Sequence, residues 1–145
     1  MAGGWGNEWY FGYRHDHSDL TCQDFRSRDA WWDYCRYALE FFTAGSDENR
    51  NPVPLWNMSN ANSRVGGDGN RCLYGKDDGG KPCLVVQTDD GGSFTLDVPA
   101  AAKYKAGWMN AKTGSWQYDD DIADHAGGSI SFTAPGTDDW ILLIW

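Results

Sequence analysis

The stretch GGWGNEWYFGYRHDH, residues 3–17, gathers glycines, aromatic rings, a glutamate and two histidines into a few positions. This mixture is typical of a loop that faces a ligand. Paired carboxylates can carry out general acid and base catalysis, and Glu8 could form such a pair with Asp19 or Asp24. Loop solvation and helix capping are the simpler roles for these acids.

Two other groups of residues have the chemical types that bind metals. His15 and His17 lie beside Asp16 and Asp19, but a transition-metal site needs three or four ligands that converge, which a sequence does not show. The segment DDDIADH, residues 119–125, offers oxygen ligands for calcium, although it lacks the glycine and the terminal glutamate of an EF-hand loop. An exposed acidic loop is the alternative. No cofactor and no metal ligand is therefore expected, with calcium in the β-domain as the alternative.

The four cysteines, Cys22, Cys35, Cys72 and Cys83, include no CxxC pair, so no zinc site is predicted. A bridge between Cys72 and Cys83 is one interpretation of their spacing. Two buried thiols are the other.

The composition excludes several partners. The 145 residues carry a net charge of -9, which argues against nucleic acid and against an acidic membrane surface, because both attract lysine and arginine. No apolar run is long enough to span a bilayer, and the residues after Met1 lack the pattern of a signal peptide. The aromatic share of 15%, with 9 Trp, is high, and so many rings need a core or a ligand to cover them.

The segment SRDAWWDYCRYALEFFTAG, residues 27–45, predicts a helix directly after the loop. Ser27 or Asp24 would cap its start, and Gly45 would end it. Apolar residues repeat at helical spacing and form an unusually wide stripe, which comprises Trp31, Trp32, Tyr34, Cys35, Tyr37, Ala38, Leu39, Phe41 and Phe42. So wide a stripe predicts packing partners on more than one side of the helix.

Short alternating runs between residues 71 and 145 predict an antiparallel β-sandwich. We expect strands at 71–75, 82–88, 92–98, 103–110, 115–118, 129–134 and 138–144. The repeated DDGG at 77–80 and 89–92 predicts tight hairpins, and NAKTG at 110–114 predicts a longer one with Gly114 in a left-handed conformation.

The rings of the β-region have two possible positions, inside the sandwich or on its surface. We expect Trp108 and Trp140 in the core, with aromatic pairing across the 110–114 hairpin. The sequence does not decide the position of Trp116 and Tyr118. They either belong to the core or form a flat outward platform that binds glycans.

Several motifs together resemble a family of bacterial glycoside hydrolases. MAGGWGNEWYFGY followed by HSDLTCQDFRSRDAWWDYCRYALEFF is similar to the end of the TIM barrel in those proteins. GGSFTLDV, YKAGWMNAKTGSW and PGTDDWILLIW are similar to their C-terminal β-domain, a module labelled collagen-binding. The resemblance covers nearly the whole chain in the same order. One departure is Asn110-Ala111-Lys112-Thr113-Gly114, where the family commonly has Asn-Pro-Arg-Thr-Gly.

The resemblance implies an α+β protein with three parts. Residues 1–45 would be the last strand end, loop and helix of an incomplete (β/α)8 barrel, residues 46–70 a connector, and residues 71–145 the β-sandwich. Barrel active sites are built from the loops at the C-terminal ends of strands. The loop after the eighth strand would therefore bind sugar through Glu8, Trp9, Tyr10, Tyr13, His15, His17, Asp19 and Asp24.

In the family, the catalytic carboxylates follow the fourth and seventh barrel strands, so they would precede Met1 and no catalytic residue is expected in the chain. We therefore expect a C-terminal portion of a glycoside-hydrolase-like protein that is inactive alone. Its partners would be the missing barrel portion and a carbohydrate or an extracellular-matrix-like polymer, and the parent protein would be secreted or periplasmic.

Two alternatives remain open. The chain is a stand-alone module that binds carbohydrate or collagen, with the helix as a cover, or it is an enzyme whose barrel a partner chain completes. Burial of Trp31, Phe41 and Phe42 against the β-domain favours the module, and exposure of these rings favours the fragment.

Overall fold

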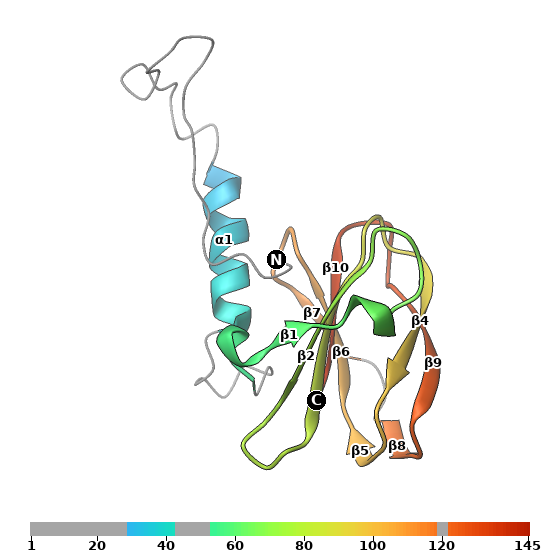
Figure 1. Ribbon diagram of the computed structural model, residues 1–145. Coiled ribbons are helices and arrows are strands. Elements are labelled where there is room, and N and C mark those ends of the chain that lie inside the picture. The colour runs from blue at the N-terminus through green and yellow to red at the C-terminus, as the bar shows by residue number, and fades with distance from the viewer. Residues whose placement is uncertain (1–28, 43–52, 119–121) are drawn as a thin grey trace.

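The computed structural model describes residues 29–42, 53–118 and 122–145 (Figure 1). Their elements are α1 (Asp29–Phe42), the 3-10 turns η3 (Leu55–Asn57) and η4 (Asn62–Arg64), and the strands β1 (Ser59–Asn60), β2 (Arg71–Lys76), β3 (Pro82–Gln87), β4 (Ser93–Val98), β5 (Ala101–Tyr104), β6 (Ala106–Asn110), β7 (Trp116–Tyr118), β8 (Ile122–His125), β9 (Gly128–Thr133) and β10 (Trp140–Ile144). The described fold is mostly antiparallel β-sheet with one helix, as expected for a sandwich-like domain. The barrel segment stays a prediction.

The main layer is a six-stranded antiparallel sheet with the strand order β1-β2-β3-β10-β6-β7. β10 lies in the middle, with Leu142 opposite Val86 of β3 on one side and opposite Trp108 of β6 on the other. Each of the five residues of β10 is buried. This explains its continuous apolar sequence, because a strand covered on both faces has no polar side.

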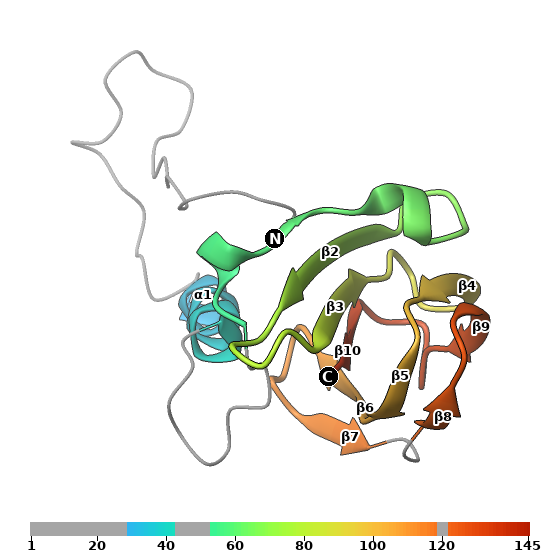
Figure 2. The ribbon, with the colours of Figure 1, turned by 60° about the horizontal axis from the view of Figure 1, so that its bottom comes forward.

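The second layer is a long two-stranded ribbon made of β4–β9 and β5–β8. The pairing keeps one register across an interruption, with Val98 opposite Gly128 and Ala101 opposite His125. Pro99 lies at the break, where its ring nitrogen has no hydrogen to donate. The Tyr104 hydroxyl donates to the Pro99 carbonyl over 3.0 Å. The ribbon covers one face of the six-stranded sheet, and α1 lies over the other (Figures 1 and 2).

Two cores follow from the alternation of side chains along the strands. The sandwich core lies between the sheet and the ribbon and contains Trp108 and Trp140, as predicted. The helix-side core lies between the sheet and α1 and contains Phe41, Phe42 and Met109. The sheet is therefore apolar on both faces.

The two DDGG turns have different roles. Residues 77–80 form the expected hairpin between β2 and β3, with the Gly80 amide donating to the Asp77 carbonyl over 2.9 Å. The hairpin expected at 89–92 is wrong, because β3 and β4 belong to different sheets. Asp90, Gly91 and Gly92 do have positive φ angles of 62°, 72° and 86°, and this turn carries the chain from one layer to the other.

Two other expectations are corrected. Ile122–His125, interpreted as the end of an acidic loop, forms strand β8, while residues 119–121 lie outside the described part. A Cys72–Cys83 bridge is wrong, because Cys72 lies opposite Val86 and contributes to the sandwich core, whereas Cys83 contributes to the helix-side core. The thiols are on opposite faces of the sheet. Burial raises the pKa of each of them to about 12.

Part of the expected connector packs on the β-domain. β1 pairs with β2, and Val53 is buried in the helix-side core. The Arg64 guanidinium binds the Asp97 carboxylate over 2.7 Å and so joins η4 to β4. The three-part division of the chain remains a prediction. Among the helices of the described ranges, none has the length and hydropathy needed to cross a lipid bilayer.

Candidate binding site

The sugar-binding residues predicted in the N-terminal loop are not among those that the structure describes. They are Glu8, Trp9, Tyr10, Tyr13, His15, His17, Asp19 and Asp24. Their roles stay predictions, and so does calcium binding by the 119–125 segment.

Trp116, one of the two rings predicted as a glycan platform, contacts the helix. The Trp116 and Phe41 rings stack with 5.6 Å between centroids and 1° between planes. Trp116 lies opposite Met109, and Tyr118 lies opposite Gly107, so the ring pairing expected between Trp108 and its neighbour across the hairpin is wrong: Gln117 is opposite Trp108. At most one face of the Trp116 ring remains for a ligand.

α1 is held against the sheet by its C-terminal end. Phe41 and Phe42 are 3% and 7% exposed, whereas Trp31 is 39% exposed. The three rings were expected to be either all buried or all exposed, and they are not. Tyr34, Tyr37, Ala38 and Phe41 follow a spacing that puts them on one side of the helix. Because Phe41 anchors that side to the sheet, the other three residues face the sheet above it.

A cavity of about 230 Å³ lies between α1 and the sheet. Its walls are Tyr34, Tyr37 and Ala38 from α1, Gln87, Met109 and Ile141 from the ends of three strands, and Ala111, Lys112 and Asp139 from two loops. The helix thus supplies rings, and the sheet side supplies apolar surface together with an amide, an ammonium and a carboxylate. Such a mixture of apolar surface and a few polar groups is typical of small-molecule sites.

Tyr37 is positioned by the 110–114 hairpin. A Cβ atom added to Gly114 would overlap the Tyr37 ring, so only glycine permits the observed approach. Gly114 also has a φ of 70°, as the sequence predicts, and its amide donates to the Asn110 carbonyl over 2.9 Å. The Arg36 guanidinium lies 4.6 Å from the Tyr37 ring centroid. The ring is therefore fixed by contacts with both the hairpin and the helix.

The polar wall is organised by Lys112. Its ammonium donates to the Asp138 carboxylate over 2.9 Å, and this bond raises the pKa of Lys112 and lowers that of Asp138. Both groups are consequently charged at neutral pH. The Ala111 amide donates to the Asp139 carbonyl over 2.9 Å, which holds the two loops together.

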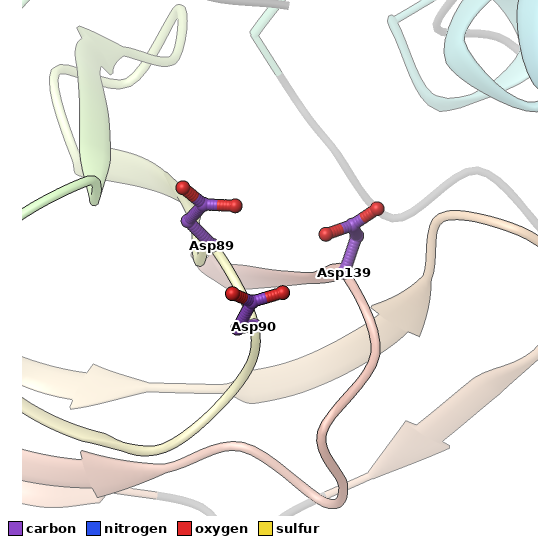
Figure 3. Close-up of side chains that lie close together, drawn as sticks. All are labelled: Asp89, Asp90 and Asp139. Carbon is purple, nitrogen blue, oxygen red and sulfur yellow. The ribbon is translucent and has the colours of Figure 1, made fainter.

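Three carboxylates gather beside this wall (Figure 3). Asp89, Asp90 and Asp139 each offer an oxygen within 4.8 Å of the others, a spacing that a cation could bridge. Exposed acidic groups commonly cluster without a metal, and Asp89 and Asp90 are exposed. Their definite consequence is a negative potential at this side of the cavity.

Sequence reasoning missed this assembly. Gln87 pairs with Ile141, so the loop after β3 and the loop before β10 lie at the same end of the sheet. The acidic pairs at 89–90 and 138–139 were the available signal. Only the pairing of β3 with β10 brings them together.

No protein-family model and no curated protein matches the chain. Its fold is similar to part of a glycoside hydrolase family 5 crystal structure from Bacteroides vulgatus, with a TM-score of 0.60 and 18% identity over 78% of this chain and 23% of that one. A second structure, named as a glycoside hydrolase, has a TM-score of 0.52 and 20% identity over 64% of this chain and 22% of that one.

A family 29 carbohydrate-binding module also matches, but its TM-score of 0.28, at 17% identity over 66% of this chain and 82% of that one, is too low to compare folds. The chain spans less than a quarter of each glycoside hydrolase. The described β-rich fold thus occurs as one part of larger glycoside hydrolases.

Proposed function

We propose that the chain is the C-terminal part of a glycoside-hydrolase-like protein and that its β-domain has an accessory, carbohydrate-related role. One observation carries the proposal. Two glycoside hydrolase structures share the fold over most of this chain, yet the chain spans only 23% and 22% of them. The catalytic barrel would belong to the part of the protein that precedes α1.

The solvent-facing side of α1 supports this proposal. Trp32, Cys35 and Leu39 form a second apolar stripe at i, i+3 and i+7, and Trp32 and Leu39 are 49% and 63% exposed. Large apolar side chains gathered at a surface mark a place where another part of a protein packs. The preceding barrel segments would cover this stripe, with residues 1–45 as the last loop and helix of that barrel.

Within such a protein, the N-terminal loop that carries Glu8 would bind sugar, and the catalytic carboxylates would come from earlier barrel strands. The chain alone would then bind but not hydrolyse its polysaccharide. The parent protein would be secreted or periplasmic, where polysaccharides are met.

A stand-alone module is the second candidate, and the burial of Phe41 and Phe42 against the sheet favours it. In that case α1 is an integral layer of a module that binds carbohydrate or collagen. Collagen as a ligand is suggested only by the label of the domain that the β-region resembles.

The two candidates differ in the gene. If the chain is part of a larger protein, the DNA upstream of the Met1 codon continues in frame with a barrel-coding sequence. A stop codon followed by a ribosome-binding site directly before Met1, with no barrel behind it, would reject the first candidate and leave the module.

The carbohydrate-related role is tested on the full chain. Sedimentation with insoluble cellulose, mannan and xylan should retain it on at least one polysaccharide, without release of reducing sugar. Fibrillar collagen is the comparison. Retention on collagen alone would replace carbohydrate with collagen as the ligand, and retention on none of the four would remove the binding role.

A further inference from the structure

The cavity between α1 and the sheet is sized for one small ring. Its volume of about 230 Å³ is below the ~300–1,000 Å³ that drug-sized ligands occupy. It is nevertheless several times the ~30 Å³ that one water molecule takes in the liquid. A single ring of a longer chain would fit, with its neighbours leaving through the open side.

The two walls offer what a sugar ring needs. Tyr34 on the helix side, with Met109 and Ile141 on the sheet side, presents apolar surface to carbon–hydrogen faces. Gln87, Lys112 and Asp139 bring an amide, an ammonium and a carboxylate, which together donate to and accept from hydroxyl groups. A purely apolar ligand would offer these polar groups no hydrogen bonds, which disfavours its binding.

The charges disfavour an anionic ligand. Lys112 is the cationic residue of the lining, and Asp138 already compensates it over 2.9 Å. Asp89, Asp90 and Asp139 gather beside it, and the whole chain has a net charge of -9. An anionic ligand would meet this negative field.

We infer that this cavity is a subsite for one ring of a neutral polysaccharide. This inference rests on the carbohydrate-related role proposed above. Tyr34 is the ring that packs on the sugar, and Gln87, Lys112 and Asp139 bind its hydroxyls. Phe41 and Gly114 are positioning residues, since Phe41 anchors the helix wall and Gly114 allows the Tyr37 ring to approach the hairpin. The subsite exists only when α1 is docked on the sheet.

The test is isothermal titration calorimetry of the full chain with soluble gluco-, manno- and xylo-oligosaccharides and with an oligogalacturonate as the anionic probe. Tyr34→Ala removes the packing ring, and alanine keeps the helix propensity. Ala38→Leu instead fills the cavity and removes no polar group. Trp32→Ala is the matched control, because it deletes an exposed ring from the opposite side of the same helix.

We expect the unaltered chain and Trp32→Ala to bind a neutral oligosaccharide equally, and Tyr34→Ala and Ala38→Leu each to bind it roughly tenfold or more weakly, as when a central aromatic contact is truncated. Circular dichroism of each variant must match the unaltered chain. If one of the two cavity variants is misfolded, the other decides.

The remaining outcomes separate the two proposals. Equal binding by both cavity variants and the unaltered chain would reject the subsite and leave the carbohydrate-related role intact. Preference for the oligogalacturonate would reject neutrality. Binding of no saccharide by the unaltered chain would reject the carbohydrate-binding role and the subsite with it.

Discussion

Phe41 of α1 and Trp116 of β7 stack face to face, with 5.6 Å between ring centroids and 1° between ring planes. This pair joins the helix to the edge strand of the six-stranded sheet, and Phe42 meets Phe41 edge-on at 4.8 Å. The helix is therefore attached at its C-terminal end through aromatic contacts. Tyr34, Tyr37 and Ala38, which precede these rings in the helix, line the cavity.

Phe41→Ala should detach α1 from the sheet. The substitution removes a ring that is 3% exposed, and the cavity it leaves is expected to cost roughly 3–5 kcal/mol of unfolding free energy. Leu39→Ala, at a residue on the same helix that is 63% exposed, should change it by no more than about 0.5 kcal/mol. Urea unfolding followed by circular dichroism measures both values. Similar losses in the two variants would show that the stack does not hold the helix.

Gly114→Ala should destabilise the protein more than Gly80→Ala. Both glycines lie in hairpin turns with positive φ, 70° and 82°, so both substitutions carry a backbone cost of about 1–2 kcal/mol. Only the Cβ at position 114 meets a neighbour, the Tyr37 ring, and overpacking adds about 1–3 kcal/mol. In a Tyr37→Ala background the extra cost should disappear, as a double-mutant cycle would measure. Persistence of the difference there would mean that Tyr37 is not its cause.

Stability should fall at alkaline pH because of two buried thiols. Burial raises the pKa of Cys72 and Cys83 to about 12 from an ordinary value of 9.0. Below pH 9 the thiols are protonated in both states, so their contribution is constant. Between pH 9 and 12 the unfolded chain loses these protons first, and the unfolding free energy decreases as pH rises.

The measurement is urea unfolding across this pH range, with Cys72→Ala and Cys83→Ala as comparisons. Each variant should show a shallower alkaline slope whatever its stability at neutral pH. An unchanged slope in both would exclude the thiols as its source.

Tyr104→Phe should weaken the ribbon at its break. The Tyr104 hydroxyl donates to the Pro99 carbonyl over 3.0 Å, next to the point where the β4–β9 and β5–β8 pairs are interrupted. Loss of this bond should lower the unfolding free energy by about 0.5–1.5 kcal/mol. Tyr74→Phe, at a half-buried residue of β2, is the control. Thermal unfolding compares them, and an equal effect would deny the Pro99 contact a role.

The regular elements could be predicted from the sequence where residue spacing alone defines them. The apolar repeat from Trp31 to Phe42 gave the helix, and alternating runs gave most strands. Strand β8 was not predicted, because its sequence IADH follows three aspartates and lacks a run of residues that favour strands. The turn at 89–92 was misjudged because φ > 0 residues serve a change of sheet as well as a hairpin.

The candidate site could not be predicted in the same way. Tyr34 and Asp139 are distant in the chain, and their approach depends on how Phe41 and Phe42 dock α1 and on the pairing of β3 with β10. Neither the docking angle of a helix nor the order of strands follows from periodicity. The side of the sheet on which Trp116 lies was likewise not predictable. It depends on the strand register, which places Trp116 opposite Met109, and the hairpin sequence does not define that register.

The central position of β10 bears on how the molecule folds. β2–β3 and β6–β7 pair strands that are neighbours in the sequence, but they become one sheet only when β10 inserts between β3 and β6. The long loop closure this requires makes the insertion slow relative to hairpin formation. Leu142→Ala should therefore speed unfolding much more than it slows refolding in stopped-flow measurements, and the opposite pattern would place β10 in the nucleus. Until β10 arrives, the apolar edges of β3 and β6 are open to pairing with other chains, which makes this insertion the step most exposed to aggregation.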